Sequence, residues 1–263
     1  MPILWCIFGG MQVRIYLTGR VGLELGGKLI VQERQFRGRQ ERVAFAYLVS
    51  ERDRPVTREE LAEVIWPGEQ PPAWPTALSA IVSRLRSLLS HRELRASSVS
   101  ISRGFGQYRL FLPSDTWVDS EAATSAIDAA VAALRAGDPA SAFGPAAVAV
   151  SIGRRPFLSG ANGGWVSLER EKLGRLRVRA LEVLATVWLF NDEPALAVEN
   201  AAEAVAIDRL RESSHRLLMQ AHASAGNPAE AIQCYHRLRR LLADELGTDP
   251  SSETEALYLK LLG

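Results

Sequence analysis

Residues 75–90 read PTALSAIVSRLRSLLS, and this stretch decides the fold of the first half of the chain. Apolar residues recur along it at the spacing of one helical face: Leu78, Ile81, Val82, Leu85, Leu88 and Leu89. The opposite face has no acid and carries Ser79, Ala80, Ser83, Arg84, Arg86 and Ser87. Small side chains with arginines suit a helix in the major groove of DNA. An ordinary amphipathic surface helix gives the same pattern, so the neighbouring sequence must decide between the two.

Composition describes a globular protein. The chain has 263 residues, of which 47% are hydrophobic and 23% charged, enough for one large domain or two of ordinary size. Cys6 and Cys234 are too far apart in sequence to suggest a disulfide framework or a zinc cluster, which favours a reducing cytoplasm. The apolar start is too short for a membrane span or a signal peptide, so residues 1–11 are expected to be an N-terminal extension, with Met11 as an alternative start.

Charge is distributed unevenly although the net charge is only +1. Up to Pro113 the chain has 16 lysines and arginines against 10 acids, and beyond it 15 against 20. A basic half joined to an acidic half is typical of a nucleic-acid-binding domain followed by a domain with another task.

Two further helices are expected before residue 75. The apolar spacing of residues 39–51 predicts the first of them. Thr57 and Glu60 have the spacing of a capping box and open the second. We expect that helix to end at Trp66, because a proline disfavours helical geometry in the residue before it.

Short strands flank the three helices. Residues 11–31 alternate apolar and polar side chains, which predicts two or three antiparallel strands. Residues 99–112 alternate again around a glycine turn, which predicts a hairpin with Arg103 and Arg109 near its tip. Strands, three helices and a basic hairpin follow one another as in a winged helix, a variant of the helix-turn-helix.

Three segments carry a family resemblance: LAEVIWP (61–67), ALSAIVSRLRSLL (77–89) and SRGFGQYRL (102–110). Together they resemble the DNA-binding domain of OmpR/PhoB-type response regulators, although Gln107 is an additional residue in the wing pattern. The resemblance implies phosphate and base contacts by Arg84 and Arg86 and wing contacts by Arg103 and Arg109. The residues expected to bind DNA are Ser79, Ala80, Ser83, Arg84, Arg86, Ser87, Arg103, Gln107 and Arg109.

The second half contains a repeat. The segment from Pro194 to Val198 recurs from Pro228 to Ile232, a shift of 34 residues, which is the tetratricopeptide period. A third copy begins at Pro139. Each copy is expected to begin the second helix of a pair, with a small residue that lets the two helices approach: Ala142, Ala197 and Ala231. Such pairs stack into a solenoid.

A long helix is expected over residues 165–190, after a loop at 153–164. Its inner face would carry Leu168, Leu173, Leu176, Val183, Leu184 and Val187. Its outer face would carry Arg170, Lys172, Arg175, Arg177 and Arg179. We interpret this basic run as a solvated helix face, with a supplementary contact to the DNA backbone as the alternative.

Four segments of the second half resemble the bacterial transcriptional activator domain: GRRPFL (153–158), WVSLER (165–170), AIDRLRE (206–212) and LLADELGTDPSSETEALY (241–258). In the Streptomyces antibiotic regulatory protein family this domain follows an OmpR-like winged helix. The expected fold is therefore an α+β winged helix-turn-helix at 12–113 followed by an all-α, tetratricopeptide-like domain at 114–263.

The resemblance also implies a function. It implies an activator of transcription that binds direct repeats in promoters of antibiotic biosynthesis genes. The expected partners are double-stranded DNA, the sigma or alpha subunit of RNA polymerase and a second copy of the chain on DNA. The expected location is the cytoplasm, in association with the nucleoid and not with a membrane.

No constellation for catalysis stands out in the sequence. The four histidines have no nearby cysteine or carboxylate at metal-ligand spacing, and neither a phosphate-binding loop nor a serine–histidine–aspartate signature occurs. We therefore expect no enzyme activity, cofactor or metal. The alternative to a DNA-binding activator is a tetratricopeptide-type adaptor that binds proteins and lacks sequence-specific DNA binding.

Overall fold

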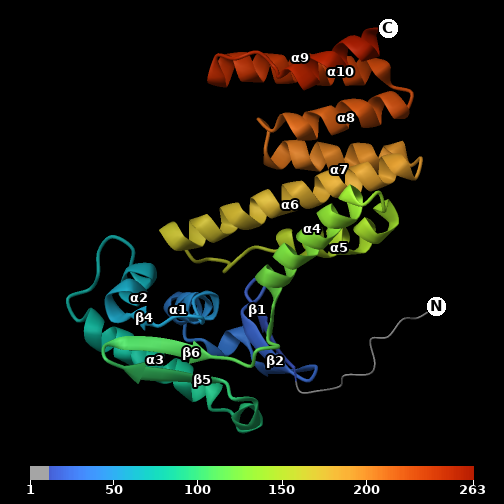
Figure 1. Cartoon of the computed structure of the whole chain (residues 1–263). Coiled ribbons are helices and arrows are strands. Elements are labelled where there is room, and N and C mark those ends of the chain that lie inside the picture. The colour runs from blue at the N-terminus through green and yellow to red at the C-terminus, as the bar shows by residue number, and fades with distance from the viewer. Residues whose placement is uncertain (1–11) are drawn as a thin grey trace. The chain divides into compact units, whose positions relative to one another are not determined.

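The computed structural model describes residues 12–263 and divides the chain into two compact units (Figure 1). The expected N-terminal extension, residues 1–11, lies outside the described residues. Among the described residues no helix is long and apolar enough to cross a lipid bilayer.

The division into units differs from the expected boundary after residue 113. Unit 1 takes the chain up to residue 122 together with residues 155–171, and unit 2 takes residues 123–154 and 172–263. Two segments of the second half therefore belong to the compact unit that contains the winged helix.

The first sheet of unit 1 has the strand order β3-β2-β1-β7. Its strands are β1 (Val13–Tyr16), β2 (Gly22–Leu25), β3 (Lys28–Val31) and β7 (Trp117–Val118). The alternation at 11–31 is confirmed, because Val13, Ile15 and Leu23 are buried and the pairs β1–β2 and β2–β3 are antiparallel. β7 was not expected and pairs with β1 in parallel.

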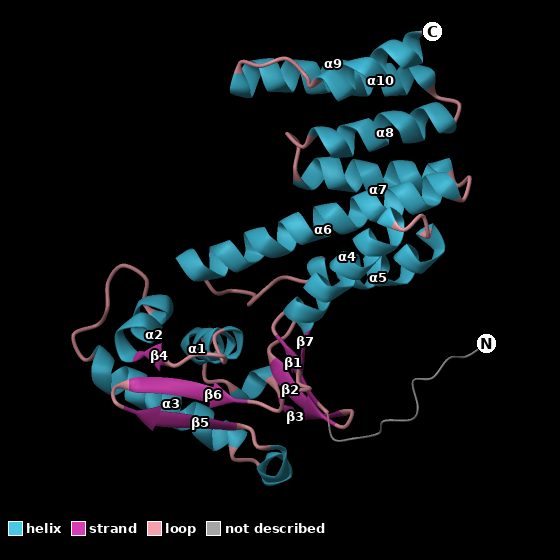
Figure 2. Cartoon of the chain, viewed as in Figure 1, coloured by secondary structure: helices cyan, strands magenta, loops and turns pink. Residues whose placement is uncertain are grey.

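Three helices form the core of unit 1 (Figure 2). They are α1 (Arg39–Ser50), α2 (Arg58–Ile65) and α3 (Trp74–Leu89), with 3-10 turns η1 (Glu33–Gln35) and η2 (Arg92–Ser97). The apolar stripe of α3 is confirmed, because Leu78, Ile81, Val82, Leu85 and Leu89 are buried. α2 ends before Trp66, as the following proline predicts.

The hairpin that follows the helices is the wing. It forms a sheet of order β4-β6-β5, from β4 (Val56–Thr57), β5 (Ser100–Gly104) and β6 (Gln107–Phe111). Gly104 pairs with Gln107 across a two-residue turn whose residues, Phe105 and Gly106, have φ of 49° and 74°. Primed hairpin turns require such positive angles. Gln107 is therefore an in-register strand residue, and the additional residue does not distort the hairpin.

Segment 155–171 packs within unit 1 through backbone and aromatic contacts. Phe157 forms a β-bridge with Thr18, and the ring of Trp165 lies 5.1 Å from that of Tyr47 and 5.7 Å from that of Phe157. Arg170 donates to the carbonyls of Phe157, Leu158 and Ala161, at 2.9 to 3.0 Å. These contacts explain why the segment belongs to unit 1, and Arg170 is correspondingly not a solvated side chain.

Asp119 joins the chain beyond the wing to the first sheet. Its buried carboxylate accepts from the backbone nitrogens of Leu17 and Thr18, at 2.9 to 3.0 Å, and from the Thr18 hydroxyl at 2.7 Å. Burial raises its pKa, although these donors favour the charged form. This carboxylate satisfies the two backbone donors that directly follow β1.

Replacing Asp119 by alanine should lower the free energy of unfolding by about 2–4 kcal/mol, because it leaves two buried backbone donors without an acceptor. Urea denaturation followed by circular dichroism measures this. Asp128→Ala is the control, since the Asp128 carboxylate is mostly exposed. Equal midpoints for the two variants would contradict the structural role of Asp119.

Unit 2 is built from helix pairs, as the repeat predicts. Its helices are α4 (Asp119–Arg135), α5 (Pro139–Gly153), α6 (Gly164–Phe190), α7 (Pro194–Ile207), α8 (Glu212–Ser224), α9 (Pro228–Leu246) and α10 (Ser252–Leu262), of which α4 and α6 begin in unit 1. Each repeated proline is the first residue of its helix, where its missing N–H costs nothing. The small residues Ala142, Ala197 and Ala231 are fully buried.

Two glutamates tie alternate helices of unit 2 together, α6 to α8 and α8 to α10. Glu182 of α6 accepts from the Arg211 guanidinium and from the hydroxyls of Ser213 and Ser214. Glu212 accepts from the backbone nitrogen of Ser251, at 2.9 Å, at the start of α10. The chain turns between helices are therefore fixed by charge-assisted hydrogen bonds.

The expected inner face of α6 is confirmed except at one position. Leu173, Leu176, Val183, Leu184 and Val187 are buried, whereas Leu168 is exposed. The expected solvated basic face is corrected at two positions, because the half-buried Arg170 donates to backbone carbonyls and the half-buried Arg177 forms an ion pair with Glu203. Arg179 forms an ion pair with Asp128 but is exposed, as expected. Helical spacing alone does not show that acidic partners from other helices reach this face.

Candidate nucleic-acid interface

The outward face of α3 is a stripe of small side chains. Thr76, Ala80, Ser83 and Ser87 are exposed and follow one another at helical spacing. No acid occurs in α3. Of the residues expected to bind DNA, Ala80, Ser83 and Ser87 lie on this stripe, and Ser79 lies beside it with its hydroxyl bonded to the Pro75 carbonyl at 2.8 Å. Because the side chains on this face are small, a partner can approach the backbone of α3 closely.

Arg84 is anchored to α1 by a buried acid. Its Nε donates to the carboxylate of Glu41, which is 2% exposed and also accepts from the backbone nitrogen of Arg37 at 2.8 Å. A hollow of about 280 Å³ beside this pair is lined by residues 37–41 and Arg84, and three of its lining residues are arginines. A guanidinium has five N–H donors, and the bond to Glu41 uses the one on Nε.

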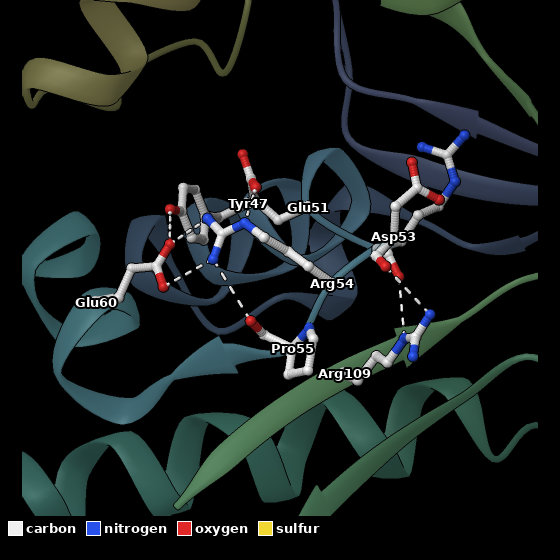
Figure 3. A network of polar contacts seen from close by, with 8 residues as sticks. Tyr47, Glu51, Asp53, Arg54, Pro55, Glu60 and Arg109 are labelled. Carbon is white, nitrogen blue, oxygen red and sulfur yellow. Dashed lines mark hydrogen bonds and ion pairs between the residues drawn. The ribbon is translucent and has the colours of Figure 1, made fainter.

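Arg86 and Arg109 are fixed by backbone carbonyls. Arg86 donates from Nε to the Ile101 carbonyl of β5, at 3.0 Å. Arg109 donates to the carbonyls of Arg52 and Asp53, at 3.4 and 3.2 Å, in the turn after α1 (Figure 3). Both side chains are half-buried, whereas the sequence places them freely at the surface. Their positions are set by tertiary contacts that sequence spacing does not reveal.

Arg103 and Gln107 occupy the outer part of the wing. Arg103 is exposed and Gln107 is half-buried, on opposite strands of the hairpin. The structure thus brings the nine candidate residues together on α3 and the wing of unit 1, in two groups. Ala80, Ser83, Ser87 and Arg103 are exposed, and Ser79, Arg84, Arg86, Gln107 and Arg109 are half-buried.

Arg58 was not predicted as part of this surface, and it connects the wing to α3. Its backbone nitrogen donates to the Gly106 carbonyl, at 3.2 Å, and its guanidinium donates to the Pro75 carbonyl, at 3.1 Å. The guanidinium also lies over the ring of Trp74. The wing tip and the start of α3 are therefore held at the same end of unit 1. In the sequence, the one signal that could have pointed to Arg58 is its position at the start of α2, directly after Thr57.

A polar network braces α1 against α2 (Figure 3). Glu60 accepts from Tyr47, at 2.6 Å, and from the guanidinium of Arg54. The expected capping box is therefore half formed: the Thr57 hydroxyl accepts from the Glu60 nitrogen, at 3.1 Å, but the Glu60 carboxylate bonds to Tyr47 and Arg54. Arg54 and then Tyr47 lower the pKa of Glu60 to about 2, and burial and Glu60 raise the pKa of Tyr47 to about 12.

The network makes the free energy of unfolding depend on pH in the acid range. The folded Glu60 carboxylate keeps its charge down to a pH of about 2, whereas in the unfolded chain it takes up a proton near its ordinary pKa of 4.5. The free energy of unfolding should therefore fall as pH falls from about 4.5 to about 2. Glu60→Gln should cost about 1–2 kcal/mol at pH 7 and progressively less below pH 4.5.

Urea unfolding of both proteins from pH 2 to pH 7 measures this difference. Glu59→Gln is the matched control, since the neighbouring Glu59 is exposed on the same helix turn. Parallel pH curves for the parent and Glu60→Gln would contradict the coupling of Glu60 to Arg54 and Tyr47.

The buried pair between Glu41 and Arg84 should matter to folding as well. Arg84→Ala leaves Glu41 buried without its charge partner and should lower the free energy of unfolding by about 2–4 kcal/mol. Adding Glu41→Gln to Arg84→Ala should recover part of this loss, because no unpaired charge then remains. A double-mutant cycle in urea measures the coupling, and additive effects of the two substitutions would contradict it.

The bacterial transcriptional activator domain family matches residues 118–262. Regulatory protein AfsR of Streptomyces coelicolor is 34% identical over 226 residues, which are 85% of this chain and 22% of AfsR. Transcriptional regulatory protein MoaR1 of Mycobacterium tuberculosis is 28% identical over 238 residues, covering 84% of this chain and 71% of MoaR1. The chain thus spans less than a quarter of the length of AfsR.

A solved structure has the same fold. The structure titled Mycobacterium tuberculosis EmbR in complex with low affinity phosphopeptide matches with a TM-score of 0.82 at 23% identity, over 95% of this chain and 65% of that one. The chain thus shares with that structure the fold of a winged helix followed by tetratricopeptide-like helix pairs. The family that matches the helix pairs is a domain of bacterial transcriptional activators, which defines the class of protein.

Within that class, the domain match identifies the family. The chain belongs to the bacterial transcriptional activator domain proteins of the Streptomyces antibiotic regulatory protein family. Of the relatives named above, AfsR is named a regulatory protein and MoaR1 a transcriptional regulatory protein.

Proposed function

We propose that this protein is a sequence-specific DNA-binding activator of transcription. The observation that carries the proposal is the outward stripe of α3, where Ala80, Ser83 and Ser87 are exposed and small, on a helix that contains no acid. An α-helix of this kind fits the major groove, in which hydroxyls and backbone approach base edges. The names of the relatives, a regulatory protein and a transcriptional regulatory protein, support the same function.

The half-buried arginines suit contacts to the DNA backbone. Arg84 and Arg86 each form a hydrogen bond from Nε to another protein group, which holds the rest of the guanidinium in a defined orientation. Fixed guanidinium groups lose little freedom when they meet a phosphate. Arg103 would contact the backbone or the minor groove from the wing. Such contacts predict that affinity falls steeply with salt.

Further parts of the proposal rest on the family. We propose that the protein binds direct repeats as a pair of copies, in promoters of antibiotic biosynthesis genes, and that it acts in the cytoplasm. Stacked helix pairs present extended surfaces for protein partners, so unit 2 is the part that would contact RNA polymerase, through its sigma or alpha subunit. We propose no catalytic step, cofactor or metal, and in residues 12–263 no cluster of three or more potential ligands is placed to hold a metal ion.

An acid placed on the stripe tests the proposal. Ser83→Asp should weaken binding to a selected DNA site by about 100-fold, because a carboxylate would face phosphates and base-edge acceptors. Ser125→Asp on α4 is the matched control, since Ser125 is also an exposed helical serine and gives the same change of charge. Fluorescence anisotropy on a duplex recovered from a random library measures both, and equal affinities would remove α3 from the interface.

The adaptor alternative predicts a different result. If the chain only binds proteins, no duplex is enriched from the random library and the parent is not retained on heparin. Recovery of one enriched duplex whose binding weakens with salt would exclude this alternative.

A further inference from the structure

The tip of the wing carries an aromatic ring in open solvent. Phe105 is fully exposed and is the first residue of the turn between β5 and β6. A Cβ added at Gly104 or at Gly106, on either side of it, would meet no atom within 4 Å. The side of the turn that faces away from the protein is therefore open, although the Gly106 carbonyl accepts from the Arg58 backbone nitrogen at 3.2 Å.

Local folding gives no reason for a phenylalanine at this position. The φ of Phe105 is +49°, in the left-handed region that glycine and asparagine adopt readily and that side chains with a bulky Cβ substituent avoid. The ring also buries no surface in the described residues. Backbone strain and an exposed apolar ring at one residue point to a role in binding, since each is unfavourable in the free protein.

The surroundings of Phe105 are basic and are linked to α3. Arg103 is exposed two residues before it, and Arg58 links the Gly106 carbonyl to the Pro75 carbonyl at the start of α3. The flanking glycines let the backbone approach a partner closely, because they have no side chain to hold it away. Two paired strands are too wide for a minor groove of about 6 Å, so only the ring at the end of the hairpin is narrow enough to enter one.

We propose that Phe105 is an apolar wedge that enters the minor groove of the DNA site, a proposal that rests on the function proposed above. The ring contacts deoxyribose and the edges of the bases. It partly unstacks one base step, as apolar side chains do in proteins that kink DNA from the minor groove. Arg103 beside it contacts the phosphates or the negatively charged groove.

The wedge gives specificity without hydrogen bonds to bases. Pyrimidine–purine steps such as TA and CA unstack more easily than other steps, so the site under the wing should contain one. Phe105 is thereby assigned as a specificity-determining residue that reads the deformability of DNA. The base pairs under the tip would be selected by their stacking and not by their donor and acceptor pattern.

The experiment uses the full chain and duplexes that it selects from a random library. Phe105→Gly removes the ring and relieves the positive φ, so its thermal midpoint should equal or exceed that of the parent. Its affinity should fall by about 10-fold, the order that one base–aromatic stacking contact contributes. Phe105→Leu, which keeps an apolar wedge, should lose less.

Two further readouts separate a wedge from a charge contact. Arg103→Ala should reduce the slope of log affinity against log salt by about 1, whereas Phe105→Gly should leave this slope unchanged. The fluorescence of 2-aminopurine placed at the step under the wing should rise when the parent binds and should not rise with Phe105→Gly, because an unstacked base is less quenched.

The outcomes distinguish this proposal from the function on which it rests. If the parent enriches no duplex, the DNA-binding function fails and the wedge with it. If the parent binds but Phe105→Gly binds equally well and gives the same 2-aminopurine signal, the wedge alone is overturned. If Phe105→Gly keeps full affinity for one half-site but loses cooperative binding of a second copy, the ring contacts protein, which also overturns the wedge.

Discussion

The buried carboxylate of Glu41 is the constraint on which the arrangement of unit 1 depends. It is 2% exposed, and it holds the guanidinium of Arg84 and the backbone nitrogen of Arg37 at the start of α1. A buried charge is tolerated only with such partners, so α1 and α3 are fixed in one relative position. The hydrophobic stripe of α3 determines which face is buried, and Glu41 determines where along α1 that face lies.

Much of the fold follows from local sequence patterns. The α3 stripe, the alternation at 11–31 and the helix-starting prolines of unit 2 are each visible in one continuous stretch of sequence, and each is confirmed by burial, strand pairing or the bounds of the helix. The contacts of residues 155–171 could not be predicted in this way. They join Trp165 to Tyr47 and Phe157 to Thr18, over more than a hundred residues of sequence. Leu168 was misplaced for the same reason: helical spacing shows which residues share a face of the helix, but not whether another element packs on that face.

The candidate site was predicted as a set of residues but not as an arrangement. Helical spacing placed Ala80, Ser83 and Ser87 correctly on an exposed face. It could not show that Arg84 and Arg109 are held by groups on other elements. Contacts between residues far apart in sequence produce no periodic pattern in the sequence. The role of each residue on DNA stays a prediction, whereas the surface that carries them is a property of the folded unit.

The composition of unit 1 has a consequence for how the protein folds during synthesis. Its first sheet needs β7 and the buried carboxylate of Asp119, and its packing includes Trp165 and Arg170. The helices of the winged domain therefore leave the ribosome long before the unit that contains them is complete. Until residue 171 has emerged, the nascent chain exposes apolar surface around Tyr47. Such surface is prone to aggregation unless a chaperone binds it.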